Sequence, residues 1–161
     1  FYIDICGFSR ILKKCSTDPP FSSGSVEHTV MCNSQDIEMY NGSCLCGTIR
    51  YQISSESGVV GNCHCKMCQK QHGALFATYW SIKKTDLTYL AGEENLSSYN
   101  SSKGIQRRFC SICGSNIGWS GSAEFPDWVS IAIATLDSEF IPKKIENYHL
   151  ESASIYNKNL S

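Results

Sequence analysis

The sequence lacks a long apolar run, an excess of charge of either sign and a basic stripe. No apolar stretch approaches the roughly 18 residues that a membrane helix needs, so we expect no membrane span. The net charge of −1 and the absence of clustered lysines and arginines argue against nucleic acid and anionic lipid as partners. The first fifteen residues have no long apolar core and no small-residue cleavage site, so we expect no signal peptide.

Helical periodicity is also scarce, whereas turn signals recur about every ten residues. Stretches rich in aromatic and β-branched residues predict strands at 46–53, 74–82, 85–92, 95–101, 105–110, 115–120 and 128–137. In the first, Ile49, Tyr51 and Ile53 alternate with polar residues. In the last, Val129, Ile131 and Ile133 are expected to face the core. We therefore expect a mostly β fold, with at most a short helical turn after Cys68.

The first 38 residues differ in character from the remainder. They contain Pro19-Pro20 and a Ser/Gly patch at 21–25, without sustained periodicity. We predict an extension of uncertain order at 1–38 and one zinc-binding domain at 39–161. Three cysteines of the extension have irregular spacing and are interpreted as incidental free thiols: Cys6, Cys15 and Cys32.

Seven of the ten cysteines lie in the β-rich part, as C-x-C at 44/46, C-x-C-x-x-C at 63/65/68 and C-x-x-C at 110/113. If the backbone is extended, the two cysteines of a C-x-C lie on one face with Cα atoms roughly 6–7 Å apart, near the upper limit for an unstrained disulfide. Two thiols so placed suit a shared metal ion. We therefore predict metal ligation in a reducing, cytoplasmic environment.

Glycine follows two of the motifs, as Gly47 after Cys46 and Gly114 after Cys113. A glycine there lets the chain turn so that backbone amides point at the thiolates, as in zinc knuckles. Two such pairs make a closed four-cysteine site and leave the 63/65/68 cluster with three ligands. The spacing leaves a second pairing open, in which 44/46 combines with 63/65.

These motifs, GSCLCG (42–47), NCHCKMCQKQHGALFATYW (62–80), GIQRRFCSICGSNIGW (104–119) and VSIAIATLD (129–137), resemble the glutathione-dependent formaldehyde-activating enzyme family, also called the GFA/centromere protein V domain. The resemblance covers about residues 40–150. It implies a β-tent fold of antiparallel sheets and two zinc ions. It implies that Cys44, Cys46, Cys110 and Cys113 hold a structural zinc ion, and that Cys63, Cys65 and Cys68 hold a catalytic one.

Three thiolates suit a particular chemistry. They leave a zinc ion with a formal charge of −1 and one open position, so it is a weak Lewis acid and unsuited to hydrolysis. A thiol fits that position better, because zinc binds it as a nucleophilic thiolate at neutral pH. We expect glutathione or another small thiol to attack formaldehyde there, giving S-(hydroxymethyl)glutathione. The reverse is a carbon–sulfur lyase reaction, as the resemblance also implies.

Several side chains near the motifs are candidates for substrate contact. The carboxylates of glutathione favour cations, and Arg107, Arg108, Lys66 and Lys70 flank the zinc ligands. Adjacent strand residues face opposite sides, so at most one arginine is expected to line the site.

The remaining polar and aromatic candidates have competing structural roles. His72 is either a proton relay or a packed polar residue, and His64 is expected to point away from the metal. Asn116 and Trp119 suit either substrate contact or the strand core.

Two other function classes compete with the lyase. One is a non-catalytic zinc module that binds a protein or nucleic acid, although no basic tail supports it. The other is a redox protein in which the cysteines of the 63/65/68 cluster oxidise reversibly and release zinc. Methionine sulfoxide reductases of the B type also join a four-cysteine zinc site to a β-rich fold, but they need a reactive cysteine outside the zinc sites. None remains in this part of the chain.

Overall fold

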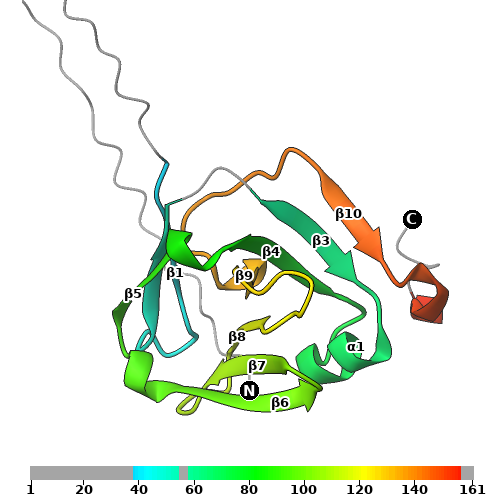
Figure 1. Cartoon of the computed structure of the whole chain (residues 1–161), viewed down its shortest axis with the longest axis horizontal. Helices are drawn as coiled ribbons and strands as arrows, with labels where there is room; N and C mark the ends of the chain where they lie inside the picture. Colours follow the sequence, from blue (N-terminus) through cyan, green and yellow to red (C-terminus); the bar gives the residue numbers. More distant parts are fainter. Residues whose placement is uncertain (1–37, 55–57, 157–161) are drawn as a thin grey trace, which may run out of the picture. The chain divides into compact units, whose positions relative to one another are not determined.

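Two β-sheets build the part of the chain that the computed structural model describes, residues 38–54 and 58–156. The larger sheet has the strand order β10-β3-β4-β9-β8-β7-β6 (Figure 1). Its strands are β3 (Val59–Cys63), β4 (Ala77–Lys83), β6 (Leu96–Ser102), β7 (Ile105–Cys110), β8 (Asn116–Ser120), β9 (Trp128–Ala132) and β10 (Ile145–Tyr148). Neighbours are antiparallel except β10, which runs parallel to β3. The predicted mostly β class is confirmed.

The smaller sheet has the order β1-β2-β5, with β1 (Tyr40–Ser43), β2 (Arg50–Ile53) and β5 (Leu87–Ala91). The alternation predicted around β2 is confirmed, because Ile49, Tyr51 and Ile53 are all fully buried while Arg50 is exposed. The hydroxyl of Tyr51 lies 2.7 Å from that of Thr135, so this buried ring keeps a hydrogen-bond partner.

The hydrophobic core joins residues of both sheets. Trp80 on β4 stacks on Phe140 at a centroid distance of 4.2 Å, and Tyr40 meets Trp80 edge-on. Val129 and Ile131 on β9 are buried as predicted, whereas Ile133 lies in the 3₁₀ turn η3 (Ile133–Thr135) and is partly buried against the core. The predicted strand at 128–137 therefore ends at Ala132, where η3 begins.

Three short 3₁₀ turns complete the described elements: η1 (Lys84–Asp86), η2 (Glu93–Asn95) and η4 (Leu150–Ser152). The helix differs from the sequence prediction, since α1 (Lys66–His72) begins before Cys68 and is longer than a single turn. Cys65 caps it, because its sulfur accepts a hydrogen bond from the Cys68 amide, and Gly73 ends it in the left-handed region at φ 59°. This cap was not predicted, because the spacing of the cysteines pointed to metal ligation instead.

Strands β1, β3 and β10 were not predicted from the sequence. Of these, β3 contains Gly61 and β10 has mostly exposed side chains, so neither shows the alternation of a half-buried strand. The predicted extension at 1–38 lies, apart from Glu38, outside the described residues, as do Cys6, Cys15 and Cys32, and its boundary stays a prediction. Within the described residues, no helix has the length and apolar character for a membrane crossing.

Candidate metal centres

Four cysteines from two distant segments meet at one point, which we call the four-cysteine centre: Cys44, Cys46, Cys110 and Cys113. Their sulfurs all lie within 4.8 Å of one another. The Cys46 sulfur lies 3.4 Å from that of Cys44 and 3.9 Å from that of Cys110. Tetrahedral zinc with Zn–S bonds of about 2.3 Å needs sulfurs about 3.8 Å apart. The group therefore fits zinc, and the structure brings 44/46 together with 110/113 rather than with 63/65.

Tight turns shape both halves of the four-cysteine centre. Gly47 and Gly114 have φ values of 73° and 77°, the left-handed region that favours glycine. The Gly47 amide donates to the Cys44 carbonyl at 2.8 Å, and the Gly114 amide donates to the Cys110 carbonyl at 2.9 Å. The predicted knuckle turns are thus present in both segments.

Hydroxyl groups lower and burial raises the pKa values of these thiols. Ser115 hydrogen-bonds Cys113 through its side chain and backbone, which lowers the pKa of that thiol to about 5. Thr48 lowers the pKa of Cys46 in the same way. Burial raises the pKa of Cys110 to about 11. A buried thiol ionises readily only against a cation, so this donor set is suited to a metal ion.

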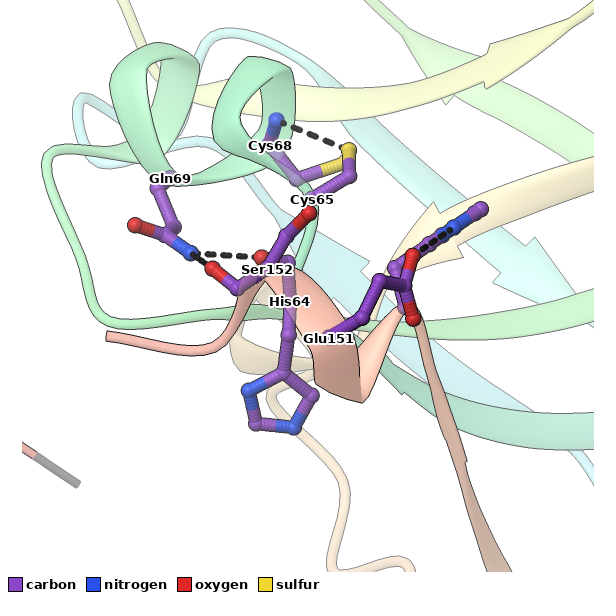
Figure 2. Close-up of polar contacts among 7 residues, drawn as sticks. His64, Cys65, Cys68, Gln69, Glu151 and Ser152 are labelled. Atoms are coloured by element: carbon purple, nitrogen blue, oxygen red, sulfur yellow. Dashed lines mark hydrogen bonds and ion pairs between the residues drawn. The ribbon is translucent and has the colours of Figure 1, made fainter. Parts of the chain in front are cut away.

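The second group, which we call the three-cysteine centre, consists of Cys63, Cys65 and Cys68, with all three sulfurs within 4.8 Å of one another. Cys63 ends β3, Cys65 caps α1, and Cys68 lies in its first turn. The Cys68 amide donates to the Cys65 sulfur at 3.4 Å (Figure 2). The cap of the helix thus places two sulfurs side by side, and the end of β3 adds the third.

His64 lies between two of these ligands but turns away from them. Figure 2 shows its ring pointing away from the sulfurs of Cys65 and Cys68. Its Nε2 lies 3.2 Å from Asn147 Oδ1, and the ring packs on Phe76 at a centroid distance of 5.0 Å. His64 is therefore a buried neighbour of the centre and is oriented as expected from the sequence.

Arg107 lies directly beside the three-cysteine centre. It is buried, and its Nη2 donates to the Cys68 sulfur at 3.6 Å. Its Nη1 donates to the Tyr79 hydroxyl at 3.3 Å and to Gln71 Oε1. The hydrogen bond with Cys63, and then the guanidinium, lower the pKa of Cys68 to about 5, while the same contact raises the pKa of Cys63. The guanidinium of Arg107 thus favours the thiolate form of Cys68.

The two arginines of β7 face opposite sides, as expected for adjacent strand residues. Arg107 points to the three-cysteine centre, whereas Arg108 lies near Tyr89, on the opposite face of β7. Sequence reasoning thus identified the pair, and the structure selects Arg107.

The remaining candidates from the sequence are placed less directly. His72 is half-buried with Nε2 at 2.7 Å from the Tyr79 hydroxyl, and burial lowers its pKa. Lys66 and Lys70 are exposed on α1. The side chain of Asn116 exchanges two 3.1 Å hydrogen bonds with Gln71, which ties α1 to β8.

A cleft of about 750 Å³ lies over the three-cysteine centre, and all three of its cysteines line the cleft. Arg107 and Trp119 line it too, whereas Lys66, Lys70 and His72 do not. Sequence reasoning missed Tyr148 and His149, which line this cleft from the C-terminal segment.

The C-terminal segment is held at the cleft by long-range contacts. Tyr148 pairs with Cys63 in the β10–β3 register, and the His64 amide donates to the Tyr148 carbonyl at 2.9 Å. The side-chain amide nitrogen of Gln69, Nε2, donates to the backbone carbonyls of His64 and of Ser152, the latter at 3.0 Å (Figure 2). No local signal in the sequence marks these contacts.

The chain is similar to a known protein family and to several of its relatives. A family model described as glutathione-dependent formaldehyde-activating enzyme matches residues 39–159. An uncharacterized lyase of Schizosaccharomyces pombe is 30% identical over 78 residues, which are 48% of this chain and 55% of that protein. A Podospora anserina protein, provisionally named a glutathione-dependent formaldehyde-activating enzyme, is 32% identical over 76 residues, 46% of this chain and 36% of that protein. The chain thus spans about half the length of these relatives or less.

The fold also has a solved counterpart. A crystal structure of a Rhodobacter sphaeroides protein matches with a TM-score of 0.55 at 20% identity, over 66% of this chain and 98% of that chain. At this identity the likeness concerns the fold alone.

Proposed function

Because the chain belongs to the glutathione-dependent formaldehyde-activating enzyme family, we propose that it is a carbon–sulfur lyase that joins glutathione, or another small thiol, to formaldehyde and catalyses the reverse reaction. In the forward direction the sulfur–carbon bond forms, the C=O π bond breaks, and the thiol proton ends on the aldehyde oxygen. The observation that carries this proposal is the three-cysteine centre in the wall of a cleft, separate from a second, four-cysteine group.

Two zinc ions are part of the proposal. Cys44, Cys46, Cys110 and Cys113 would hold a structural ion, and Cys63, Cys65 and Cys68 would hold the catalytic one. A zinc ion bound by three thiolates supplies a position at which a further thiol is held as a nucleophilic thiolate near neutral pH. The family, the donor types and the sulfur distances support this assignment.

The chain's own residues would orient the reactants. Arg107 hydrogen-bonds Cys68 and holds the helix in place through Gln71. Burial raises the pKa of Tyr79, so its hydroxyl stays protonated in the cleft wall, 2.7 Å from His72. Tyr79 and His72 together offer a route for the proton that the adduct oxygen gains.

Exchange NMR tests this proposal. Free and hydroxymethylated glutathione would be mixed with formaldehyde and zinc-loaded protein, with the Cys65→Ser variant, and without protein. We expect faster interconversion with the native chain only, because Cys65→Ser removes one ligand of the three-cysteine centre.

The alternatives give different results in the same experiment. No acceleration by folded protein that carries two zinc ions would refute the lyase proposal for this thiol. Reversible zinc loss on mild oxidation would then favour a redox role. Zinc retention without any thiol chemistry would favour a binding module.

A further inference from the structure

The walls of the cleft over the three-cysteine centre are aromatic and carry little charge. Among the described residues that line it, five are aromatic: Tyr79, Trp119, Phe125, Trp128 and Tyr148. Val59 and Ile105 add aliphatic surface. Of lysine, arginine, aspartate and glutamate, the described lining includes only Arg107 and Glu124. Such walls suit an apolar molecule, and about 750 Å³ is within the usual range for ligand pockets.

The guanidinium of Arg107 already forms hydrogen bonds within the protein. The side chain is only 5% exposed and donates to Cys68, Gln71 and Tyr79. Its remaining Nε group, which has no hydrogen-bond partner among the described residues, is itself covered from solvent. Three thiolates around a divalent zinc ion carry a net charge of −1, which one guanidinium balances. With zinc bound, Arg107 would therefore neutralise the centre, and its charge would not be available to a ligand.

A glutathione carboxylate would find poor partners in this lining. Moving a carboxylate away from water costs several kcal/mol unless a cation or hydrogen-bond donors replace the water. The nearby lysines of α1 do not line the cleft, and Glu124 would repel an anion. The hydroxyls of Ser81 and Ser130 already lie 2.8 Å from each other, and Nδ1 of His149 lies 3.4 Å from a Glu151 carboxylate oxygen. Ser102 and Ser122 leave only neutral hydroxyls in the lining.

We propose that the preferred thiol of this chain has a neutral, apolar body, and that it binds with its sulfur at the three-cysteine centre and its body against the aromatic walls. This inference rests on the proposed function, in which that centre receives a thiol. It narrows the thiol class from anionic peptides such as glutathione to uncharged thiols with an aromatic or branched aliphatic group.

Matched thiols test the inference. N-acetylcysteine, its methyl ester, its benzyl ester and glutathione would each be assayed with formaldehyde in the exchange experiment, and each rate divided by the spontaneous rate. We expect the acceleration to rise from N-acetylcysteine to the methyl ester and again to the benzyl ester, by about tenfold or more overall. Equal accelerations, or the largest one with glutathione, would overturn the inference.

A binding measurement separates this inference from the proposed function. Titration of the zinc-loaded protein with the same four thiols, followed by tryptophan fluorescence, ranks their Kd values, because Trp119 and Trp128 line the cleft. If no thiol is turned over, the lyase proposal fails while the order of Kd values still decides the inference. Tighter binding of glutathione than of the benzyl ester would contradict it.

Two variants at the rim locate the binding surface. Phe125 is 57% exposed, so Phe125→Ala spares the core. It is expected to weaken binding of the benzyl ester several-fold more than binding of N-acetylcysteine. Glu124→Gln is expected to reduce the ratio of the Kd of N-acetylcysteine to the Kd of its methyl ester by about two- to fivefold. Glu94→Gln, an exposed acid outside the cleft lining, is the control and should leave that ratio unchanged. If Glu124→Gln left this Kd ratio unchanged and Phe125→Ala left the Kd of the benzyl ester unchanged, the thiol body would bind elsewhere.

Discussion

Arg107 brings a full positive charge to a position that solvent hardly reaches. A buried guanidinium is stable only when acceptors replace its water, and here Cys68, Gln71 and Tyr79 do so. The neighbouring Arg108 is partly exposed and lies on the other face of β7. Two adjacent residues of one type therefore have different roles, which makes them a natural matched pair for mutagenesis.

Replacing Arg107 with Gln should weaken zinc binding at the three-cysteine centre by about tenfold or more, since groups that hydrogen-bond metal ligands typically contribute that much. Competition with a chromophoric chelator measures the affinity, and the thiolate-to-cobalt charge-transfer band of the cobalt-loaded protein reports the number of thiolate ligands. Arg107→Lys should restore part of the affinity, because it keeps the charge. Arg108→Gln is the control. An unchanged affinity and cobalt spectrum in Arg107→Gln would show that Arg107 serves packing alone.

At the level of elements, α1 and the C-terminal segment share one hydrogen-bonding side chain. Gln69 on α1 donates to the carbonyl of His64 before the helix and to that of Ser152 in η4. The parallel pairing of β10 with β3 brings η4 to this position. The 3₁₀ turn has few contacts of its own, so we infer that Gln69 determines how firmly it docks beside the three-cysteine centre.

Gln69→Leu should therefore loosen η4 without unfolding the sheets. Each lost hydrogen bond contributes about 0.5–1.5 kcal/mol, which would reduce the protection of the amides of Ser152 and Ala153 about tenfold. Hydrogen exchange followed by NMR measures this residue by residue, with the amides of β9 as internal reference. Gln106→Leu, at an exposed position of β7, is the control. Equal protection of η4 in both variants would assign its docking to β10 alone.

At the level of the whole described region, the two cysteine centres have different positions in the fold. The four-cysteine centre joins the loop that follows β1 of the small sheet to the end of β7 in the large one, and Leu45 additionally donates to Ser115 at 2.9 Å. The three-cysteine centre uses a shorter stretch, from the end of β3 to α1. Metal binding at the first would thus connect the sheets, whereas metal binding at the second would affect one cleft.

Cys110→Ser should consequently unfold or aggregate the domain, because losing Cys110, a buried ligand of a closed site, removes on the order of several kcal/mol of folding free energy. Cys65→Ser should melt close to the native chain while losing thiol binding. Thermal denaturation by circular dichroism, with the zinc content measured for each variant, tests both. If the two variants melted alike, the division into a structural and a catalytic centre would be wrong.

Much of this organisation follows from short stretches of sequence. The alternation of Ile49, Tyr51 and Ile53 depends on neighbours within five residues, and so do the spacing of each cysteine motif and the glycine that follows it. The strands at 105–110 and 115–120 were predicted to within one residue for the same reason. These features rest on backbone periodicity and the reach of adjacent side chains, which are properties of local sequence.

Contacts between distant segments were decided by the tertiary structure. Which cysteine pairs combine, which arginine meets Cys68, and the presence of Tyr148 and His149 in the cleft depend on strand register and on residues more than 35 positions apart. The helix cap formed by Cys65 was not predicted, because a cysteine in this motif was interpreted only as a metal ligand. Sequence determined the chemistry that each segment carries; only folding determined which segments share a site, because such proximity leaves no periodic pattern along the chain.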